Sequence, residues 1–188
     1  MKFKITLKIN RKFGDLLPFN YQYEQSAVIY RILAQADTQY SAWLHENGYL
    51  LHERKRFKLF CYSPFIFEKV RPLPEAGCLK IIGERAVWYI SFIPEKSTLE
   101  FIQGIFAHQS FSIGNKKYQV AFDVVGVEAI PMPQLSEEMT FVALSPICVK
   151  LHEDNKTQYL SPDNSMFSEG VLKGLMARYE SIHGQPFD

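Results

Sequence analysis

The sequence predicts an α+β fold of the ferredoxin-like (RRM-like) kind, with one complete βαββαβ domain and an incomplete second one. Three observations lead to this prediction. Over residues 1–130, periodic stretches follow the order strand, helices, strands, helix, strand. The helical stretches carry apolar faces, as helices that cover one face of a sheet do. After residues 131–138, a strand-like and a helical stretch repeat the opening half of that order.

The chain opens with a strand and two helices. The segment FKITLKI, residues 3–9, alternates apolar and polar residues, which is typical of a half-buried strand. An amphipathic helix is predicted over residues 20–36, because four of its apolar residues share one face (Ile29, Ile32, Leu33 and Ala36). A second, shorter helix follows, with Asp37 or Thr38 as its cap and Gly48 at its end.

The rest of the first domain reads as five strands and one helix. Short apolar runs between turn residues predict the strands, and an apolar stripe predicts the helix over residues 96–109. The strands are expected at residues 57–62, 79–82, 87–93, 110–113 and 118–127. The aromatic strand VWYISFI, residues 87–93, lacks the basic–Gly–aromatic start of an RNA-stacking strand, so we interpret it as core.

A linker is predicted at residues 131–138, where two prolines precede acidic residues. The second domain, residues 139–188, then begins with the apolar stretch TFVALSPICVKL, residues 140–151, expected as a buried central strand. A short strand near Tyr159 and a helix over residues 164–182 follow. With these elements alone, we expect a second domain that stops about halfway, as in a fragment or the opening part of a fusion.

Charge is unevenly distributed along a chain whose formal net charge is only +1. Residues 1–70 hold 11 Lys and Arg against 6 Asp and Glu, while the remainder holds 10 against 14. The excess of positive charge favours a surface in the first part that faces a polyanion. Because no apolar run is long enough to span a bilayer and no signal peptide is evident, we expect a cytoplasmic protein without membrane contact.

Cysteine usage indicates neither a disulfide framework nor a zinc site. The three cysteines are widely spaced and form no CxxC pair. Cys61 and Cys148 fall inside strand-like runs, so we expect them to be small core residues. The sequence also lacks an EF-hand loop and a close carboxylate cluster, so no metal and no other cofactor is expected.

The densest positive charge, HERKRFK at residues 52–58, stands directly before a predicted strand. A solvated loop is the ordinary explanation of such a run, and phosphate binding is the functional one. Upstream, Tyr30 follows the core residue Ile29 and His45 follows Leu44, about 100° round each helix. Both side chains therefore stand at the border of an apolar face, where they reach solvent.

Four segments together resemble the Cas6 family, the CRISPR-associated endoribonucleases of the RAMP superfamily that cut precursor CRISPR RNA within its repeats. The segments, in order and spacing, are LPFNYQYEQSAVIYRIL, SAWLHENG, RFKLFCYSPF and MTFVALSPICVKL. The resemblance implies two ferredoxin-like domains and a metal-independent cleavage. An RNA 2′-hydroxyl attacks the adjacent phosphate, giving a 2′,3′-cyclic phosphate and a 5′-hydroxyl. The sequence departs from the family in one respect. The family has a glycine-rich loop late in the second domain, and the ten glycines of this sequence form no such cluster.

By the same resemblance, the catalytic trio is Tyr30, His45 and Lys58. Histidine suits proton transfer near neutral pH, and lysine supplies a charge for the phosphate. His52, beside the basic residues, is the rival of His45, whereas His108, His152 and His183 are expected at the surface or at caps.

Precursor CRISPR RNA is the expected partner, held by Arg54, Lys55 and Arg56. Two alternatives stay open. Besides the expected endoribonuclease, the chain could act as a module that binds repeat RNA without cutting it, or as a domain that delivers RNA to a larger CRISPR interference complex or fused domains.

Overall fold

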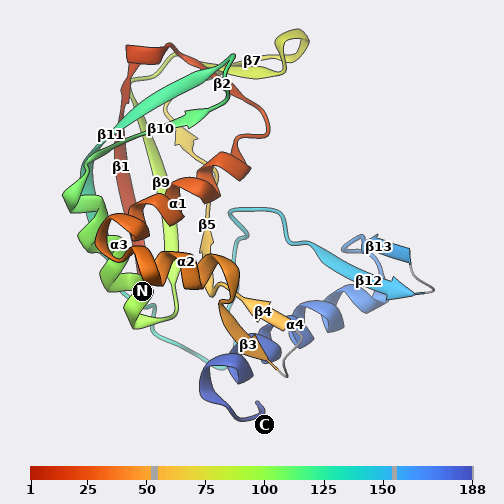
Figure 1. The fold of residues 1–188 in the computed structure, drawn as a ribbon. Coiled ribbons are helices and arrows are strands. Elements are labelled where there is room, and N and C mark those ends of the chain that lie inside the picture. The colour runs from red at the N-terminus through yellow and green to blue at the C-terminus, as the bar shows by residue number, and fades with distance from the viewer. Residues whose placement is uncertain (52–54, 154–155, 188) are drawn as a thin grey trace. The chain divides into compact units, whose positions relative to one another are not determined.

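The computed structural model describes residues 1–51, 55–153 and 156–187, which form two compact units (Figure 1). The first unit comprises Met1–His45 and Phe60–Met139, and the second comprises Glu46–Leu59 and Thr140–Asp188. The short segment Glu46–Leu59 thus groups with the C-terminal part of the chain, which the sequence did not indicate. The predicted linker at 131–138 belongs to a stretch without helix or strand, and its role as a domain boundary stays a prediction.

The main sheet of the first unit is antiparallel and has six strands, and its central strand is β1 (Lys2–Asn10). The order is β10-β11-β1-β9-β5, with β6 also paired to β9. The strands around β1 are β5 (Phe60–Tyr62), β6 (Ile66–Phe67), β9 (Arg85–Phe92), β10 (Ser110–Gly114) and β11 (Gln119–Ile130). The path β11-β1-β9-β5 is that of a ferredoxin-like sheet, so the predicted fold class is confirmed.

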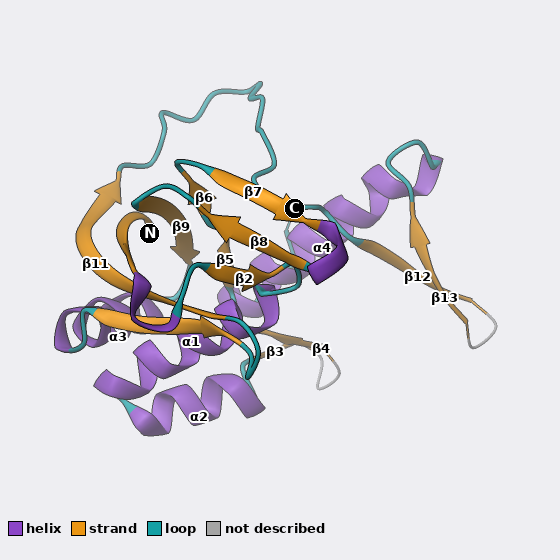
Figure 2. Ribbon diagram, turned by 90° about the horizontal axis from the view of Figure 1, so that it is seen from above, coloured by secondary structure: helices purple, strands orange, loops and turns teal. Residues whose placement is uncertain are grey.

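One face of this sheet is covered by α1 (Gln22–Ala36) and α3 (Glu95–Ala107), as Figure 2 shows. The alternation of β1 sends its apolar side chains toward the helices, where they are at most 4% exposed (Phe3, Ile5, Leu7 and Ile9). Val28, Ile29, Phe101 and Ile105 are fully or almost fully buried on the helix side. Each large side chain buried this way contributes about 1.5–3 kcal/mol.

Gly104 allows α3 to approach α1 closely. A Cβ at this position would lie 1.9 Å from the carbonyl oxygen of Ile32, so no other residue fits without moving a helix. The next helix, α2 (Thr38–Glu46), begins where Asp37 accepts a hydrogen bond from the backbone N–H of Tyr40 at 2.8 Å. Asp37 is therefore the cap that the sequence indicated.

A second, three-stranded sheet in this unit was not predicted. It runs in the order β2 (Leu16–Pro18), β8 (Cys78–Ile81) and β7 (Val70–Leu73), all antiparallel. Two 3-10 turns accompany it, η1 (Arg11–Phe13) and η2 (Pro74–Ala76). Of the three strands, only β8 was expected. Because β2 and β7 are short and contain prolines, they give no alternating pattern over a readable length.

The second unit holds a hairpin of β3 (Tyr49–Leu51) and β4 (Lys55–Phe57), a hairpin of β12 (Val149–Glu153) and β13 (Lys156–Leu160), and the helix α4 (Ser165–His183). Asn164 caps α4 by accepting a hydrogen bond from the N–H of Met166 at 2.9 Å. Gly184 ends it in the left-handed conformation, with φ of 67°. This helix and the strand near Tyr159 were predicted correctly.

The prediction of one strand over residues 57–62 is wrong. β4 ends at Phe57 and β5 begins at Phe60, and the two strands belong to different sheets. Between them Leu59 has φ of 56°, a left-handed conformation that a strand does not contain. A buried leucine in this conformation costs about 1–3 kcal/mol, so the break is imposed by the surrounding packing.

The prediction of a buried central strand over residues 140–151 is also wrong. Residues 140–148 form no strand, and Phe141 and Val142 are 76% and 84% exposed. Only the last residues of the segment enter β12, whose partner is β13. Cys61 and Cys148 are exposed rather than core residues, and Cys78 is buried. Cys61 lies on the face of β5 opposite Phe60 and Tyr62, and Cys148 precedes β12 outside any strand.

Across residues 1–51, 55–153 and 156–187, no helix combines the length and the apolar character needed to cross a membrane.

Candidate active site

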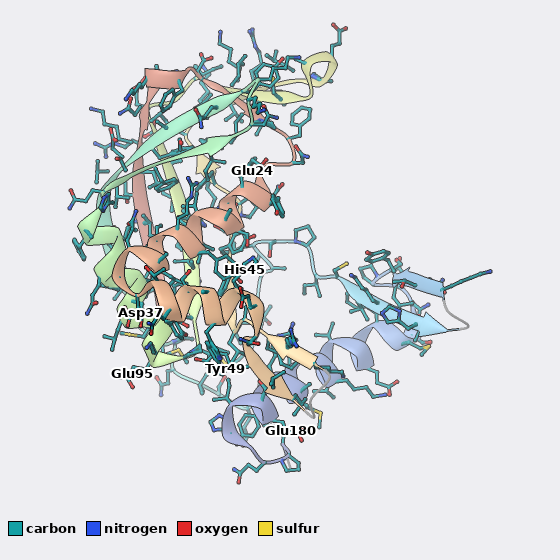
Figure 3. The ribbon with its side chains drawn as sticks, in the orientation of Figure 1. Glu24, Asp37, His45, Tyr49, Glu95 and Glu180 are labelled. Carbon is teal, nitrogen blue, oxygen red and sulfur yellow. The ribbon has the colours of Figure 1, made fainter. Side chains whose placement is uncertain are left out.

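Tyr30 and His45 are in contact in the first unit. Tyr30 lies on the half-buried border of α1, next to the fully buried Ile29, and His45 lies exposed in the last turn of α2. Figure 3 labels His45 at this helix end. The two ring centroids are 4.9 Å apart and the ring planes meet at 83°, an edge-to-face contact. The structure thus brings together two of the three predicted catalytic residues.

Ser41 connects the two helices beneath this contact. Its hydroxyl donates a hydrogen bond to the backbone carbonyl oxygen of Tyr30 at 2.8 Å, and the side chain is buried. Because Ser41 and His45 are four residues apart on α2, they share one helix face. The bond at Ser41 therefore fixes the face of α2 that presents His45 to Tyr30.

Aromatic residues of β5 complete the surroundings of Tyr30. The ring of Phe60 lies 5.8 Å from that of Tyr30, and Tyr62 stacks on Phe60 at 6.3 Å. The hydroxyl of Tyr62 donates to the backbone carbonyl of Gln22 at 3.1 Å. Burial raises the pKa of Tyr30, and the nearby Tyr62 raises it further. Tyr30 is therefore a neutral hydroxyl group, suited to donating a hydrogen bond.

Tyr62 is a neighbour that the sequence did not indicate as part of the site. In the sequence it falls within the apolar run of the strand predicted over residues 57–62. The period of two that relates Phe60 to Tyr62 was the available signal, since it places both side chains on one face of β5.

Lys58 belongs to the second unit, directly after β4. Its side chain packs over Gly48: a Cβ on Gly48 would lie 3.3 Å from Cδ and 3.4 Å from Nζ of Lys58. Gly48 has φ of 67° and stands three residues after His45 in the chain. Partial burial lowers the pKa of Lys58, and the charge of Arg56 lowers it further. Lys58 therefore gives up its proton more readily than an ordinary lysine.

The basic residues proposed to bind RNA are placed in part. Lys55 and Arg56 are exposed on β4, whereas Arg54 and the rival histidine His52 lie outside the described residues. The guanidinium of Arg56 donates to the backbone carbonyl of Glu46 at 3.0 Å, at the end of α2. Since a guanidinium carries five N–H donors, one bond to a carbonyl leaves others for a phosphate.

The remaining histidines are exposed, as expected, with His183 in the last turn of α4 and His152 at 3.0 Å from the hydroxyl of Thr157. In the described part of the chain, no group of three or more His, Cys, Asp or Glu side chains lies close enough to hold a metal ion.

Two family models match the chain. The model described as CRISPR-associated protein Cas6, N-terminal, matches residues 16–122, and the one described as CRISPR associated protein Cas6, C-terminal, matches residues 130–188.

Among curated proteins, the chain is 27% identical over 189 residues to "CRISPR-associated endoribonuclease Cas6 1" of Methanocaldococcus jannaschii, with 98% of the chain and 68% of that protein covered. It is 26% identical over 179 residues to the "Putative CRISPR-associated endoribonuclease-like protein Cas6nc" of Pyrococcus horikoshii, with 93% and 69% covered.

Among solved structures, similarity extends over the whole chain. The structure described as "Characterization of a Cas6-related gene from Pyrococcus furiosus" has a TM-score of 0.80 at 25% identity, with 100% of the chain and 73% of that structure covered. Another, described as "An RAMP protein binding different RNA substrates", has a TM-score of 0.77 at 25% identity, with 99% and 73% covered.

Proposed function

This chain belongs to the Cas6 family of CRISPR-associated proteins, and we propose that it is an endoribonuclease that cuts precursor CRISPR RNA within its repeats. Cleavage proceeds by attack of an RNA 2′-hydroxyl on the adjacent phosphate. The bond from phosphorus to the 5′-oxygen breaks, which leaves a 2′,3′-cyclic phosphate and a 5′-hydroxyl. The edge-to-face contact of Tyr30 with His45 is the observation that carries this proposal.

His45 is the base in this mechanism. The raised pKa of Tyr30 keeps its hydroxyl protonated, so Tyr30 donates a hydrogen bond to a phosphate oxygen rather than accepting a proton. The imidazole of His45 is exposed, and a neutral imidazole nitrogen is suited to accepting the proton of the 2′-hydroxyl. The two rings thus divide the tasks of base and hydrogen-bond donor.

Lys58 supplies the positive charge and the second proton. An ammonium group near the phosphate stabilises the charge that develops on its oxygens. Its lowered pKa also makes Lys58 a better acid than an ordinary lysine, suited to protonating the departing 5′-oxygen. One proton is taken by His45 and one is given by Lys58, so the step balances without a divalent metal ion.

Arg54, Lys55 and Arg56 hold the RNA in this proposal. Only Phe57 separates this run from Lys58, so phosphates bound by it lead toward the catalytic lysine. Such contacts carry little sequence information and weaken as salt rises.

Incubation of end-labelled repeat RNA with the chain in EDTA tests the proposed function. The RNA should come from the CRISPR array that accompanies the gene. Cutting in EDTA, with products ending in a cyclic phosphate, is the expected result. A gel shift without cutting would instead assign the chain as a module that binds repeat RNA; binding of RNA is what the description of one similar structure names. Cutting only after Mg²⁺ is added would contradict the metal-independent mechanism.

A further inference from the structure

A basic and aromatic surface lies at the end of β1, formed by Lys12 and Phe13 of η1 and by Lys116, Lys117 and Tyr118 of the turn between β10 and β11. We call these five residues the platform. None of them has a role in the cleavage described above.

The η1 turn holds Lys12 and Phe13 outward. The neighbouring Arg11 is tied inward, since its guanidinium donates to Glu84 Oε1 at 2.9 Å and to the backbone carbonyls of Ile81, Ile82 and Gly83 at 3.2 Å each. The side chain of Asn10 accepts the backbone N–H of Lys12 at 3.1 Å. Lys12 is exposed and the ring of Phe13 is 51% exposed on this fixed turn.

The turn between β10 and β11 is fixed as well. The Oδ1 of Asn115 accepts the backbone N–H groups of Lys117 and Tyr118, both at 2.9 Å. Gly114 has φ of 132°, and a Cβ there would lie 2.1 Å from the carbonyl oxygen of Tyr118, so the turn requires glycine. Lys116 and Lys117 are exposed on it.

The two turns meet around one shallow depression. Phe13 lines it on one side, and Gly114, Asn115, Lys116, Lys117 and Gln119 line it on the other. The ammonium group of Lys12 lies 5.3 Å from the centroid of the Phe13 ring, and that of Lys117 lies 4.8 Å from the centroid of Tyr118. No described carboxylate forms an ion pair with any of the three lysines. The platform is therefore a cationic surface on which two lysines lie close to aromatic rings.

The platform lies far from the contact of Tyr30 with His45 within the first unit. Tyr30 packs on Phe60, which pairs with Phe92, and the N–H of Phe92 bonds to the carbonyl of Met1. The contact of Tyr30 with His45 therefore lies near the start of β1, whereas the platform residues follow the end of β1. A strand of nine residues separates them by about 30 Å, and Figure 1 shows β1 running from the N-terminus to this far end.

We propose that the platform is a second RNA-binding surface, which holds single-stranded RNA several nucleotides away from the cut. The inference rests on the proposed function, since the RNA it holds is a continuation of the substrate. Lysines close to an exposed ring match one nucleotide, whose base stacks on the ring while its phosphate meets the ammonium group. A duplex keeps its bases stacked inside and offers only its phosphates, so the platform favours single strands.

Binding of a fluorescein-labelled uridine 20-mer, measured by anisotropy at several salt concentrations, tests the proposal. Replacement of Lys12, Lys116 and Lys117 by Ala should reduce the magnitude of the negative slope of log affinity against log salt by about two units, at about 0.7 per phosphate contact. The control replaces three exposed basic residues elsewhere, Lys69, Arg71 and Lys156, by Ala and removes the same net charge. That control should reduce the magnitude of the slope by less than one unit.

Phe13→Ala provides an independent measurement. Loss of one stacked base should weaken binding of the uridine 20-mer by about fivefold or more and leave the affinity for a 20-base-pair RNA duplex unchanged. Because the ring is half exposed, the variant should keep the melting temperature of the parent. Equal slopes for the two triple variants, or equal weakening of single strand and duplex by Phe13→Ala, would overturn the proposal.

Failure of this inference and failure of the proposed function are distinguishable. The uridine 20-mer reports binding whether or not the chain cuts RNA. If the parent chain cuts repeat RNA and the two triple variants bind the uridine 20-mer with equal slopes, the platform proposal fails and the proposed function stands. If the parent chain cuts no RNA but only the platform variant shows a weaker salt dependence of binding, the proposed function fails and the platform stands as a surface for single-stranded RNA.

Discussion

The ring of His45 stands edge-on to the ring of Tyr30, with centroids 4.9 Å apart and planes at 83°. The two residues come from successive helices that a short connection at Asp37 folds back on each other. One side chain is exposed and the other is half buried. The pair therefore combines access to a substrate with a fixed geometry, which a base and a hydrogen-bond donor acting on one phosphate both need.

His45→Ala should slow cleavage of repeat RNA by about 10²- to 10⁴-fold, the usual loss when a general base is removed, with little change in RNA affinity. His183→Ala is a matched control. His183 is also exposed in the last turn of a helix, and its ring lies 4.2 Å from that of Tyr179. Cleavage by the His45 variant at the parental rate would remove His45 from the mechanism and make His52 the next candidate.

Ser41→Ala should slow cleavage by about tenfold to a hundredfold, because the face of α2 that presents His45 loses its bond to the carbonyl of Tyr30. The loss of one buried hydrogen bond costs about 1 kcal/mol of stability. Ser181 provides the control, since its hydroxyl donates to the carbonyl of Arg178 at 2.8 Å in α4. Rates and melting temperatures of the two variants should be measured together. Equal cleavage by both would show that Ser41 has no positioning role.

Gly48→Ala should destabilise the chain and slow cleavage, because the added Cβ would lie 2.6 Å from the carbonyl oxygen of Phe57 and would push the Lys58 side chain aside. Gly184→Ala isolates the backbone effect. Gly184 has the same φ of 67°, with nothing within 4 Å of its added Cβ. Each alanine in this conformation costs about 1 kcal/mol. Denaturant unfolding should show a larger loss for Gly48→Ala, and equal losses would mean that Lys58 does not depend on Gly48.

The rate of cleavage should fall at alkaline pH, below the range in which an ordinary lysine titrates. Lys58 acts in its charged form, and burial followed by the charge of Arg56 lowers its pKa. As pH rises through this lowered pKa, Lys58 loses its proton and the rate declines. Arg56→Ala removes the smaller cause, so the decline should move to higher pH. Lys55→Ala is the control, and a decline that moves equally in both variants would contradict the assignment.

β1, α1 and α3 of the first unit followed from the sequence because their signals are local, whereas the three-stranded sheet of β2, β8 and β7 did not. β1 alternates over nine residues, and α1 and α3 each bury one apolar face, so periodicity alone located them. In the second unit, α4 and the strand at Tyr159 followed from the sequence, but the strand predicted over residues 140–151 did not. The apolar stretch at 140–148 has the composition of a strand but pairs with no other strand. Strand formation depends on neighbouring strands, and the composition of a segment does not show whether such neighbours exist.

The candidate site was predictable where it depends on helix geometry. Tyr30 and His45 each follow a buried residue, and a rotation of about 100° placed both at a border. Lys58 was predicted on a strand and lies outside one, because Leu59 adopts φ of 56° for reasons of packing. Ser41 was missed because a hydrogen bond from a serine to a carbonyl of another helix leaves no pattern in sequence. Tyr62 was missed although its spacing of two from Phe60 places both side chains on one face of β5.

Cleavage of repeat RNA that carries a single 2′-deoxynucleotide on the 5′ side of the cut tests the central claim most directly. This substitution removes only the attacking hydroxyl and keeps every phosphate and base. The account predicts that the chain binds the substituted RNA with unchanged affinity and does not cut it in EDTA, while it cuts the unsubstituted RNA under the same conditions. Cleavage of both RNAs at comparable rates would contradict attack by the 2′-hydroxyl, and with it the roles assigned to Tyr30, His45 and Lys58.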